Sequence, residues 1–127
     1  MIMGNFGRKS FVVFNRQKVL LSLIESLSAN NKSSRFMIVK NLFLLKKEGG
    51  IDTNGKFYDF FPYNYGPFSY QCFADINSLR KKGLLDEDEK SPNVTPVGKK
   101  YLKSIDLASK SKIDFFVNRF GDDKRGK

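Results

Sequence analysis

The sequence predicts one mainly helical domain with a small β-hairpin, an α+β fold. Three observations point to this class. Apolar residues recur at three- and four-residue steps along several segments, which is the period of an amphipathic helix. Glycine, proline and asparagine gather between these segments and mark short turns, with no long linker. The length of 127 residues suits a single domain, and no apolar run approaches the roughly 20 residues that span a bilayer.

Two helices are expected in the first half of the chain. Residues 1–10 show no periodicity and predict a flexible lead-in, so that order begins near Phe11. Asn15 can cap a helix over about residues 16–28, because its side-chain oxygen can accept a hydrogen bond from a free amide of the first turn. Ser33 or Ser34 can cap a second helix in the same way, and Gly49-Gly50 ends it.

The middle of the chain is strongly aromatic: nine of the 17 residues from Phe57 to Phe73 are Phe or Tyr. Residues 56–63 are β-prone and predict a short strand or an extended arm. Pro67 is expected to open a third helix over residues 67–82, since the N–H that proline lacks would be unpaired there. We expect five phenylalanines to form a plug in the core, because buried rings remove a large apolar area from water. They are Phe57, Phe60, Phe61, Phe68 and Phe73.

A second hairpin and two more helices are expected after Gly83. The hairpin carries a charged tip, Asp86 to Glu89, and Thr95 can cap the helix that follows, with Pro96 at its first position. The last helix has an apolar stripe at i, i+3, i+4 and i+7, formed by Ile113, Phe116, Val117 and Phe120. We expect this stripe to bind a second copy of the chain, making a homodimer. The domain would span residues 11–120, and residues 121–127 would form a disordered tail.

The net charge of +10 is concentrated on the two flanks of the sequence. Residues 1–50 hold nine Lys or Arg against two acids, and residues 91–127 hold nine against four. Such a surplus favours encounter with polyanions, of which nucleic acid is the commonest in a cytoplasm. The simpler interpretation is that the charge only confers solubility.

The order of elements suggests a family. Three helices, the basic step Lys81-Lys82-Gly83, a short hairpin and the Thr95-to-Gly98 segment together resemble a winged-helix domain of the bacterial regulator type, over about residues 15–105. The Tyr65-Gly66-Pro67 turn is also similar to Panacea-type domains associated with antitoxins. The first resemblance implies a winged helix-turn-helix fold.

The winged-helix resemblance also implies that the helix over residues 67–82 enters the major groove of DNA. The side chains near the bases would be Tyr70, Gln71, Ala74, Asn77 and Ser78, and Lys81 and Lys82 would lie near phosphates. Gln and Asn carry the paired donor and acceptor that match adenine, and lysine suits a phosphate. Further basic candidates lie at the starts of the first two helices, where they either contact DNA or form an ordinary solvated face. They are Arg16, Lys18, Lys32 and Arg35.

Two acidic features count against DNA binding. Asp75 is expected on the same exposed side of the third helix. The carboxylates of Asp86 to Glu89 would be repelled by a minor groove, and they depart from the basic wing of the family. Either the hairpin stays out of the groove or this surface meets a basic protein.

The leading hypothesis is therefore a double-stranded DNA-binding transcriptional regulator. The alternative is a protein-interaction module, antitoxin-like or adaptor, that uses the acidic hairpin. A third hypothesis is a binder of single strands or RNA that stacks bases on Tyr63 and Tyr65.

No catalytic function is predicted. The chain has no histidine, the usual general base and a common metal ligand. Its one cysteine, Cys72, is expected to be buried, and because it permits no internal disulfide we expect a reducing, cytoplasmic location. No metal, cofactor or membrane partner is expected.

Overall fold

The computed structural model describes residues 13–30, 32–51, 57–63, 66–88 and 90–120. Five helices lie in this part of the chain, and they are α2 (Asn15–Ser28), α3 (Arg35–Lys47), α4 (Tyr70–Lys81), α5 (Pro96–Ser104) and α6 (Lys110–Phe120). Two short antiparallel strands, β1 (Phe61–Tyr63) and β2 (Gly66–Phe68), form the sheet. The predicted class, mainly helical with a small sheet, is confirmed. The predicted lead-in and tail, Tyr65 and Glu89 lie outside the described residues.

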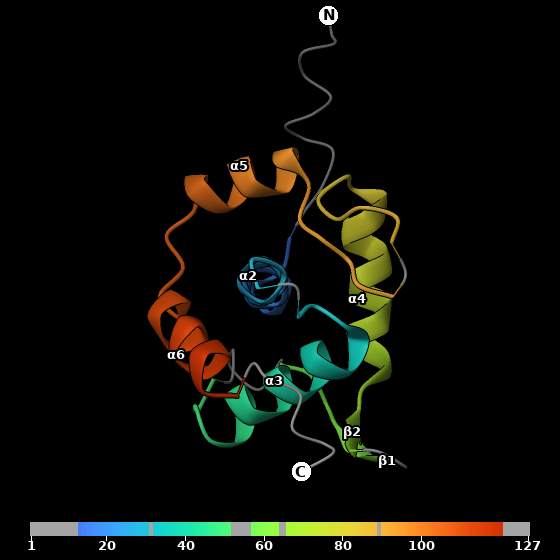
Figure 1. Cartoon of the computed structure of the whole chain (residues 1–127), viewed down its shortest axis with the longest axis vertical. Helices are drawn as coiled ribbons and strands as arrows, with labels where there is room; N and C mark the ends of the chain where they lie inside the picture. Colours follow the sequence, from blue (N-terminus) through green and yellow to red (C-terminus); the bar gives the residue numbers. More distant parts are fainter. Residues whose placement is uncertain (1–12, 31, 52–56, 64–65, 89, 121–127) are drawn as a thin grey trace, which may run out of the picture.

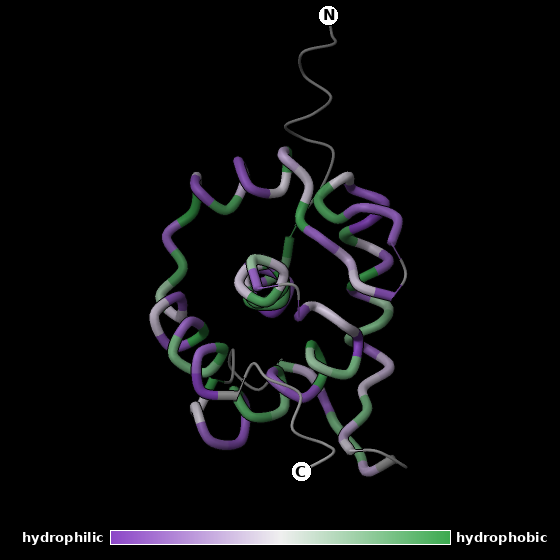
Figure 2. Tube along the Cα trace, viewed as in Figure 1, coloured by the Kyte–Doolittle hydropathy of each residue, from purple (hydrophilic) through white to green (hydrophobic). Residues whose placement is uncertain are grey.

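Helix α2 lies at the centre of the fold. Figure 1 looks along its axis and shows α3, α4, α5 and α6 arranged around it, and each of the four contacts α2. Helix α2 is apolar around most of its circumference, and such a helix must be covered on most sides. Its buried apolar residues are Val19, Leu20, Leu21, Leu23, Ile24 and Leu27. Figure 2 shows hydrophilic and hydrophobic positions alternating along the surrounding helices, as expected for helices with one face toward the core.

The ends of the first two helices lie close to their predicted places. The hydroxyl of Ser34 accepts the Met37 amide at 3.2 Å, and Gly50 has a positive φ of 69° just beyond α3. The prediction that Asn15 caps α2 is wrong. Asn15 is already helical, and Gln17 instead accepts the amide of Phe14 at 3.0 Å, which satisfies that amide from inside the first turn.

The aromatic block forms a hairpin, and the predicted plug is formed only in part. Phe57 is buried in the core, and Phe60 and Phe73 pack against the core half-buried. Pro67 lies in β2, opposite Pro62, so the prediction that it opens the third helix is wrong. Helix α4 begins at Tyr70 because the Ser69 hydroxyl accepts the Cys72 amide at 3.2 Å, a cap that a proline cannot supply. Tyr58 is fully buried, whereas Phe61 is 39% exposed.

The apolar stripe of α6 packs inside its own chain. Ile113, Phe116 and Val117 are buried in the same core cluster as α2, and α6 lies against both α2 and α3 (Figure 1). The prediction that this stripe binds a second copy is therefore wrong for these three residues. The side chain of Phe120 lies outside the described residues. The stripe was mistaken for an interface because its partner, the apolar α2, is remote in sequence.

The second predicted hairpin is reduced to one antiparallel bridge between Leu85 and Val94. Thr95 caps α5 as predicted, accepting the Gly98 amide at 3.0 Å, and Pro96 opens that helix. Across the described residues, no helix is both long and apolar enough to cross a membrane.

Helix α5 approaches this bridge at Gly98. A Cβ placed on Gly98 would overlap the carbonyl oxygen of Leu84 and would lie 2.6 Å from a methyl group of Val94. We expect Gly98→Ala to lower the free energy of unfolding by about 1–3 kcal/mol, because this overlap outweighs the better helix propensity of alanine. Urea unfolding would measure the change, with Lys99→Ala on the exposed side as control. Stability unchanged in Gly98→Ala would contradict the close approach.

Candidate functional site

Helix α4 has a buried side and an open side that differ from those predicted. Cys72, Asp75, Ile76 and Leu79 face the core, at steps of three, one and three residues. The exposed stripe runs along the opposite side through Tyr70, Ala74, Asn77 and Lys81. We call these four residues the α4 stripe. Asp75 was expected on the open side, but it is only 5% exposed.

Asp75 is buried because α2 and Tyr58 supply its hydrogen-bond partners. Its Oδ2 accepts the Tyr58 hydroxyl at 2.6 Å and Arg16 Nε at 2.8 Å. Its Oδ1 accepts Gln17 Nε2 at 3.0 Å and the second Arg16 nitrogen at 3.3 Å. A buried carboxylate is tolerated only with such compensation. This network connects α2, the segment before β1 and α4.

The network also alters its members electrostatically. Burial raises the pKa of Tyr58 far above its ordinary value, and the nearby negative charge of Asp75 adds to this effect. The pKa of Arg16 is raised chiefly by its hydrogen bond to Asp75. The Arg16 guanidinium also lies 5.1 Å from the centre of the Tyr58 ring. Arg16 was predicted to contact DNA, but its charge is engaged within the protein.

Two of the predicted base-reading residues have internal partners. Gln71 Oε1 accepts the amide of Asp59 at 2.6 Å, and Gln71 Nε2 lies 3.4 Å from an Asp59 carboxylate oxygen. Asn77 Oδ1 accepts a hydrogen bond from Arg80 at 2.9 Å, and its Nδ2 makes none within the described part of the chain. Gln71 is thus engaged on both sides, whereas Asn77 keeps a free donor.

The remaining predicted DNA-binding residues are spread over the molecule. Arg35 lies beside α4, with its guanidinium 5.0 Å from the centre of the Phe73 ring. Ser78 and Lys82 are half-buried on α4, and Lys32 lies in the turn before α3. Lys18 lies on α2, beside the segment that joins α5 to α6. The structure therefore brings Arg35 next to α4, whereas Lys18 lies beside the segment that joins α5 to α6.

The acidic loop after α4 binds its own backbone. Asp86 Oδ1 accepts the amides of Asp88 and Asn93, at 3.2 and 3.1 Å. Asp88 Oδ1 accepts the amides of Lys90 and Ser91, at 3.0 and 3.1 Å, and these bonds lower the pKa of Asp88. These two carboxylates therefore shape the loop, a role that their charge in the sequence did not reveal.

Arg80 fastens this loop to α4. Arg80 Nε donates to the carbonyl oxygen of Asp86 at 3.0 Å. A terminal nitrogen of Arg80 lies 3.4 Å from the carbonyl oxygen of Asp88. Of the three described carboxylates of the loop, Asp86 is half-buried, whereas Glu87 and Asp88 are exposed, with one oxygen of Asp88 accepting backbone amides.

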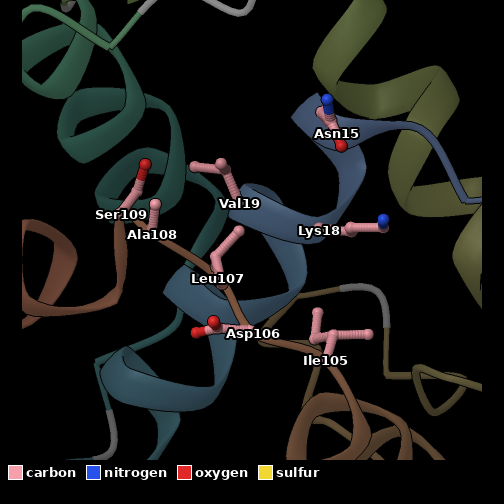
Figure 3. A pocket seen from close by; sticks show the side chains of 8 residues that line it. All are labelled: Asn15, Lys18, Val19, Ile105, Asp106, Leu107, Ala108 and Ser109. Carbon is pink, nitrogen blue, oxygen red and sulfur yellow. The ribbon is translucent and has the colours of Figure 1, made fainter.

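A cavity of about 490 Å³ lies between α2 and the segment joining α5 to α6 (Figure 3). Figure 3 shows Leu107 pointing toward Val19, while Lys18 and Asp106 point in opposite directions. Small-molecule sites usually combine an apolar lining with a few converging polar groups. Because the charged groups here diverge, this cavity is a weak candidate for a ligand site.

Among the described residues there is neither a cluster suited to a metal ion nor a reactive thiol. No group of three or more Cys, Asp or Glu side chains with the placement of a metal site occurs among those residues. Cys72 is fully buried, as predicted, and burial raises its pKa to about 12. Its thiol therefore stays protonated at neutral pH and is not an activated nucleophile.

The sequence missed how open the aromatic hairpin is. The rings of Phe61 and Phe68 lie 5.6 Å apart, and Tyr70 lies 4.8 Å from Phe68 and is 70% exposed. Tyr63 and Tyr65 were the tyrosines considered for base stacking. The side chain of Tyr63 and all of Tyr65 lie outside the described residues. The density of aromatic residues was visible in the sequence, but the face that stays open was not.

Comparisons with family models, with curated proteins and with solved structures gave no match to this chain.

Proposed function

We propose that the protein is a regulator that binds double-stranded DNA through the α4 stripe. The observation that carries the proposal is the charge of this stripe. Helix α4 is described throughout, and its one carboxylate, that of Asp75, faces inward and is neutralised by Arg16. The open side therefore presents Asn77 and Lys81 to solvent with no acid beside them on the helix.

Two residues of the stripe, Lys81 and Asn77, have specific roles in this proposal. Lys81 would contact a phosphate, and its charge adds to that of a chain with a net charge of +10. Asn77 would donate from Nδ2 to a base edge in the major groove. Arg35, which lies over the Phe73 ring at the flank of α4, would contact the DNA backbone. Arg16 and Gln71 are left out because Asp75 and Asp59 engage them.

The winged-helix assignment belongs to this proposal. Its support is the chain order of α2, α3, α4 and the Leu85–Val94 bridge, followed by α5. The small sheet between α3 and α4 has no counterpart in the predicted helix-turn-helix. The folded acidic loop would remain outside the minor groove, because Glu87 keeps a negative charge at its surface.

Binding to a labelled pool of mixed-sequence duplexes tests this function by fluorescence anisotropy. The affinity should fall steeply as salt rises from about 50 to about 200 mM, because cations are released from the phosphates. We expect Lys81→Gln to weaken binding and to reduce the slope of log affinity against log salt by about 1.

Lys110→Gln is the matched control, since Lys110 is an exposed lysine on α6, on the other side of α2 from α4 (Figure 1). It should leave the slope close to that of the unmodified protein. Absence of binding at the lowest salt would overturn the proposal, and so would an equal loss in the two variants.

A further inference from the structure

A second cavity lies beside the hairpin, on the side of α3. Its volume is about 250 Å³, and its described lining consists of Phe43, Phe60, Phe61, Pro62, Gly66 and Pro67. Phe43 and Phe60 meet edge to face at 5.5 Å. Gly66 has no side chain to fill the space and has a φ of 138°. The cavity is apolar and smaller than the roughly 300–1,000 Å³ of small-molecule sites, so it suits one large side chain.

The apolar surface continues out of this cavity. Phe61 is 39% exposed and Pro62 is exposed, and the Phe61 ring lies 5.4 Å from that of Tyr70. Folding has not removed these rings from water, although doing so would be favourable. Contiguous apolar surface of this kind marks a binding site more often than a lone exposed residue does.

The charge at the cavity determines the kind of occupant. Lys46 Nζ lies 5.9 Å from the centre of the Phe60 ring, and Lys47 Nζ lies 5.9 Å from that of Phe43. No carboxylate occurs among the described residues that line the cavity. Lys46 Nζ lies 3.9 Å from a carboxylate oxygen of Asp59 and donates to the Tyr58 carbonyl oxygen at 2.8 Å. Glu48, which follows Lys47, is exposed.

Lys47 is exposed and makes no ion pair within the described part of the chain. The Lys47 ammonium group thus lies over the ring of Phe43, which lines the cavity, and is accessible to an anionic partner. Cations that flank a hydrophobic cavity complement a segment with one apolar side chain between carboxylates.

We propose that this cavity binds an acidic peptide segment of a protein partner. One large apolar side chain of that segment enters between Phe43, Phe60 and Phe61, and the carboxylates beside it lie near Lys46 and Lys47. A nucleobase fits less well, because the described lining offers no polar side chain to its edges. The apolar surface beside the cavity adjoins the α4 stripe at Tyr70. The cavity lining does not include Asn77 or Lys81, so substitution of Lys81 tests DNA binding without changing the cavity.

A synthetic peptide, Glu-Asp-Trp-Glu-Asp with blocked ends, tests the proposal directly. The chain contains no tryptophan, so fluorescence excited at the red edge of tryptophan absorption comes from the peptide alone. We expect its emission to shift to the blue and its anisotropy to rise on titration with the protein. A comparison peptide with Lys for every acid, titrated in the same way, should bind at least about tenfold more weakly. A second with Ala for Trp has no emission of its own, so it is added as a competitor, and its inhibition constant for displacing the original peptide should be at least about tenfold higher than the dissociation constant of the original.

Two variants locate the site. Phe61→Ser should weaken binding at least about tenfold, as expected for a ring at the centre of an interface. Lys47→Glu, at an exposed position that leaves the fold intact, should weaken it about threefold, and high salt should reduce that difference. The matched controls are Phe115→Ser and Lys103→Glu, both exposed and on α6 and α5, away from the hairpin (Figure 1).

Three outcomes would overturn the proposal. The first is the absence of any spectral shift with the unmodified protein. The second is binding that Phe61→Ser and Lys47→Glu leave unchanged. The third is displacement of the peptide by single-stranded oligothymidylate, which would assign the cavity to nucleic acid. Loss of duplex binding in Lys81→Gln with retained peptide binding would separate this site from the DNA interface.

Discussion

Replacing Asp75 with alanine is expected to lower the free energy of unfolding by about 3–5 kcal/mol. The change leaves the Arg16 guanidinium without its carboxylate, and it leaves the buried hydroxyl of Tyr58 with only the carbonyl oxygen of Arg16, 3.5 Å away, as an acceptor. The change also removes the hydrogen bonds of Asp75 on α4 to Arg16 and Gln17 on α2, which hold the two helices together. Denaturant unfolding followed by circular dichroism would measure the loss.

Asp59→Ala provides the matched control. The Asp59 side chain is 83% exposed and lies 3.9 Å from Lys46 Nζ, so its removal should change stability by less than about 1 kcal/mol. Tyr58→Phe should cost about 1–3 kcal/mol, because Asp75 then loses one donor. A double variant of Tyr58 and Asp75 whose loss equals the sum of the single losses would show that these two groups do not act together.

The same network predicts a pH dependence at the alkaline end. The pKa of Tyr58 is raised above its ordinary value of 10.0, mainly by burial. The folded protein therefore holds this proton while the unfolded chain releases it, so the contribution of Tyr58 to stability is complete below pH 10 and is lost as pH rises above it. Cys72, whose pKa burial raises from 9.0 to about 12, adds a separate fall that begins near pH 9 and that is present in both proteins. Tyr58→Phe should flatten the fall above pH 10, and an identical slope in the variant would contradict the assignment.

Ile113→Ala is expected to lower the free energy of unfolding by about 2–5 kcal/mol, whatever the protein concentration. Ile113 is fully buried on α6, in the core shared with α2 and α3, so truncation opens a space inside one chain. Thermal unfolding would be measured over about a hundredfold range of protein concentration. A cavity inside one chain gives a loss that does not depend on concentration, whereas the stability of a dimer rises with concentration.

Phe115→Ala on the same helix is the control. Phe115 is 56% exposed, and its removal should cost far less than that of Ile113. If the loss in Ile113→Ala shrank as the concentration rose, the stripe would be part of an interface between copies after all.

Local signals in the sequence predicted the helices well. The caps at Ser34 and Thr95 and the stop at Gly50 depend on atoms within a few residues, so a single sequence contains them. The burial of Cys72 was predicted because its neighbours on the helix are apolar. The start of α4 was predicted wrongly because two local preferences competed. Proline favours the first position of a helix and serine favours the cap, and the Ser69 cap determined the start.

The orientation of side chains depended on remote partners and was predicted less well. Asp75 was expected outside because the helical period placed it on the side of Gln71 and Ala74. Arg16, Gln17 and Tyr58 meet it there from other elements and make its burial possible. The stripe of α6 was correctly identified as apolar, but its partner could not be named from periodicity alone. The same limit applied to Asp86 and Asp88, whose hydrogen bonds depend on the exact turn of the loop.

The sequence by itself determined the helical class, most helix ends, the net charge of +10 and the aromatic block between α3 and α4. Only the tertiary structure decided which of these features are open to a partner. It turned Asp75 and the α6 stripe inward, and it left Phe61 and Lys81 outside. The physical reason is that caps and turns are satisfied by near neighbours, whereas burial is determined by whichever elements pack together in space.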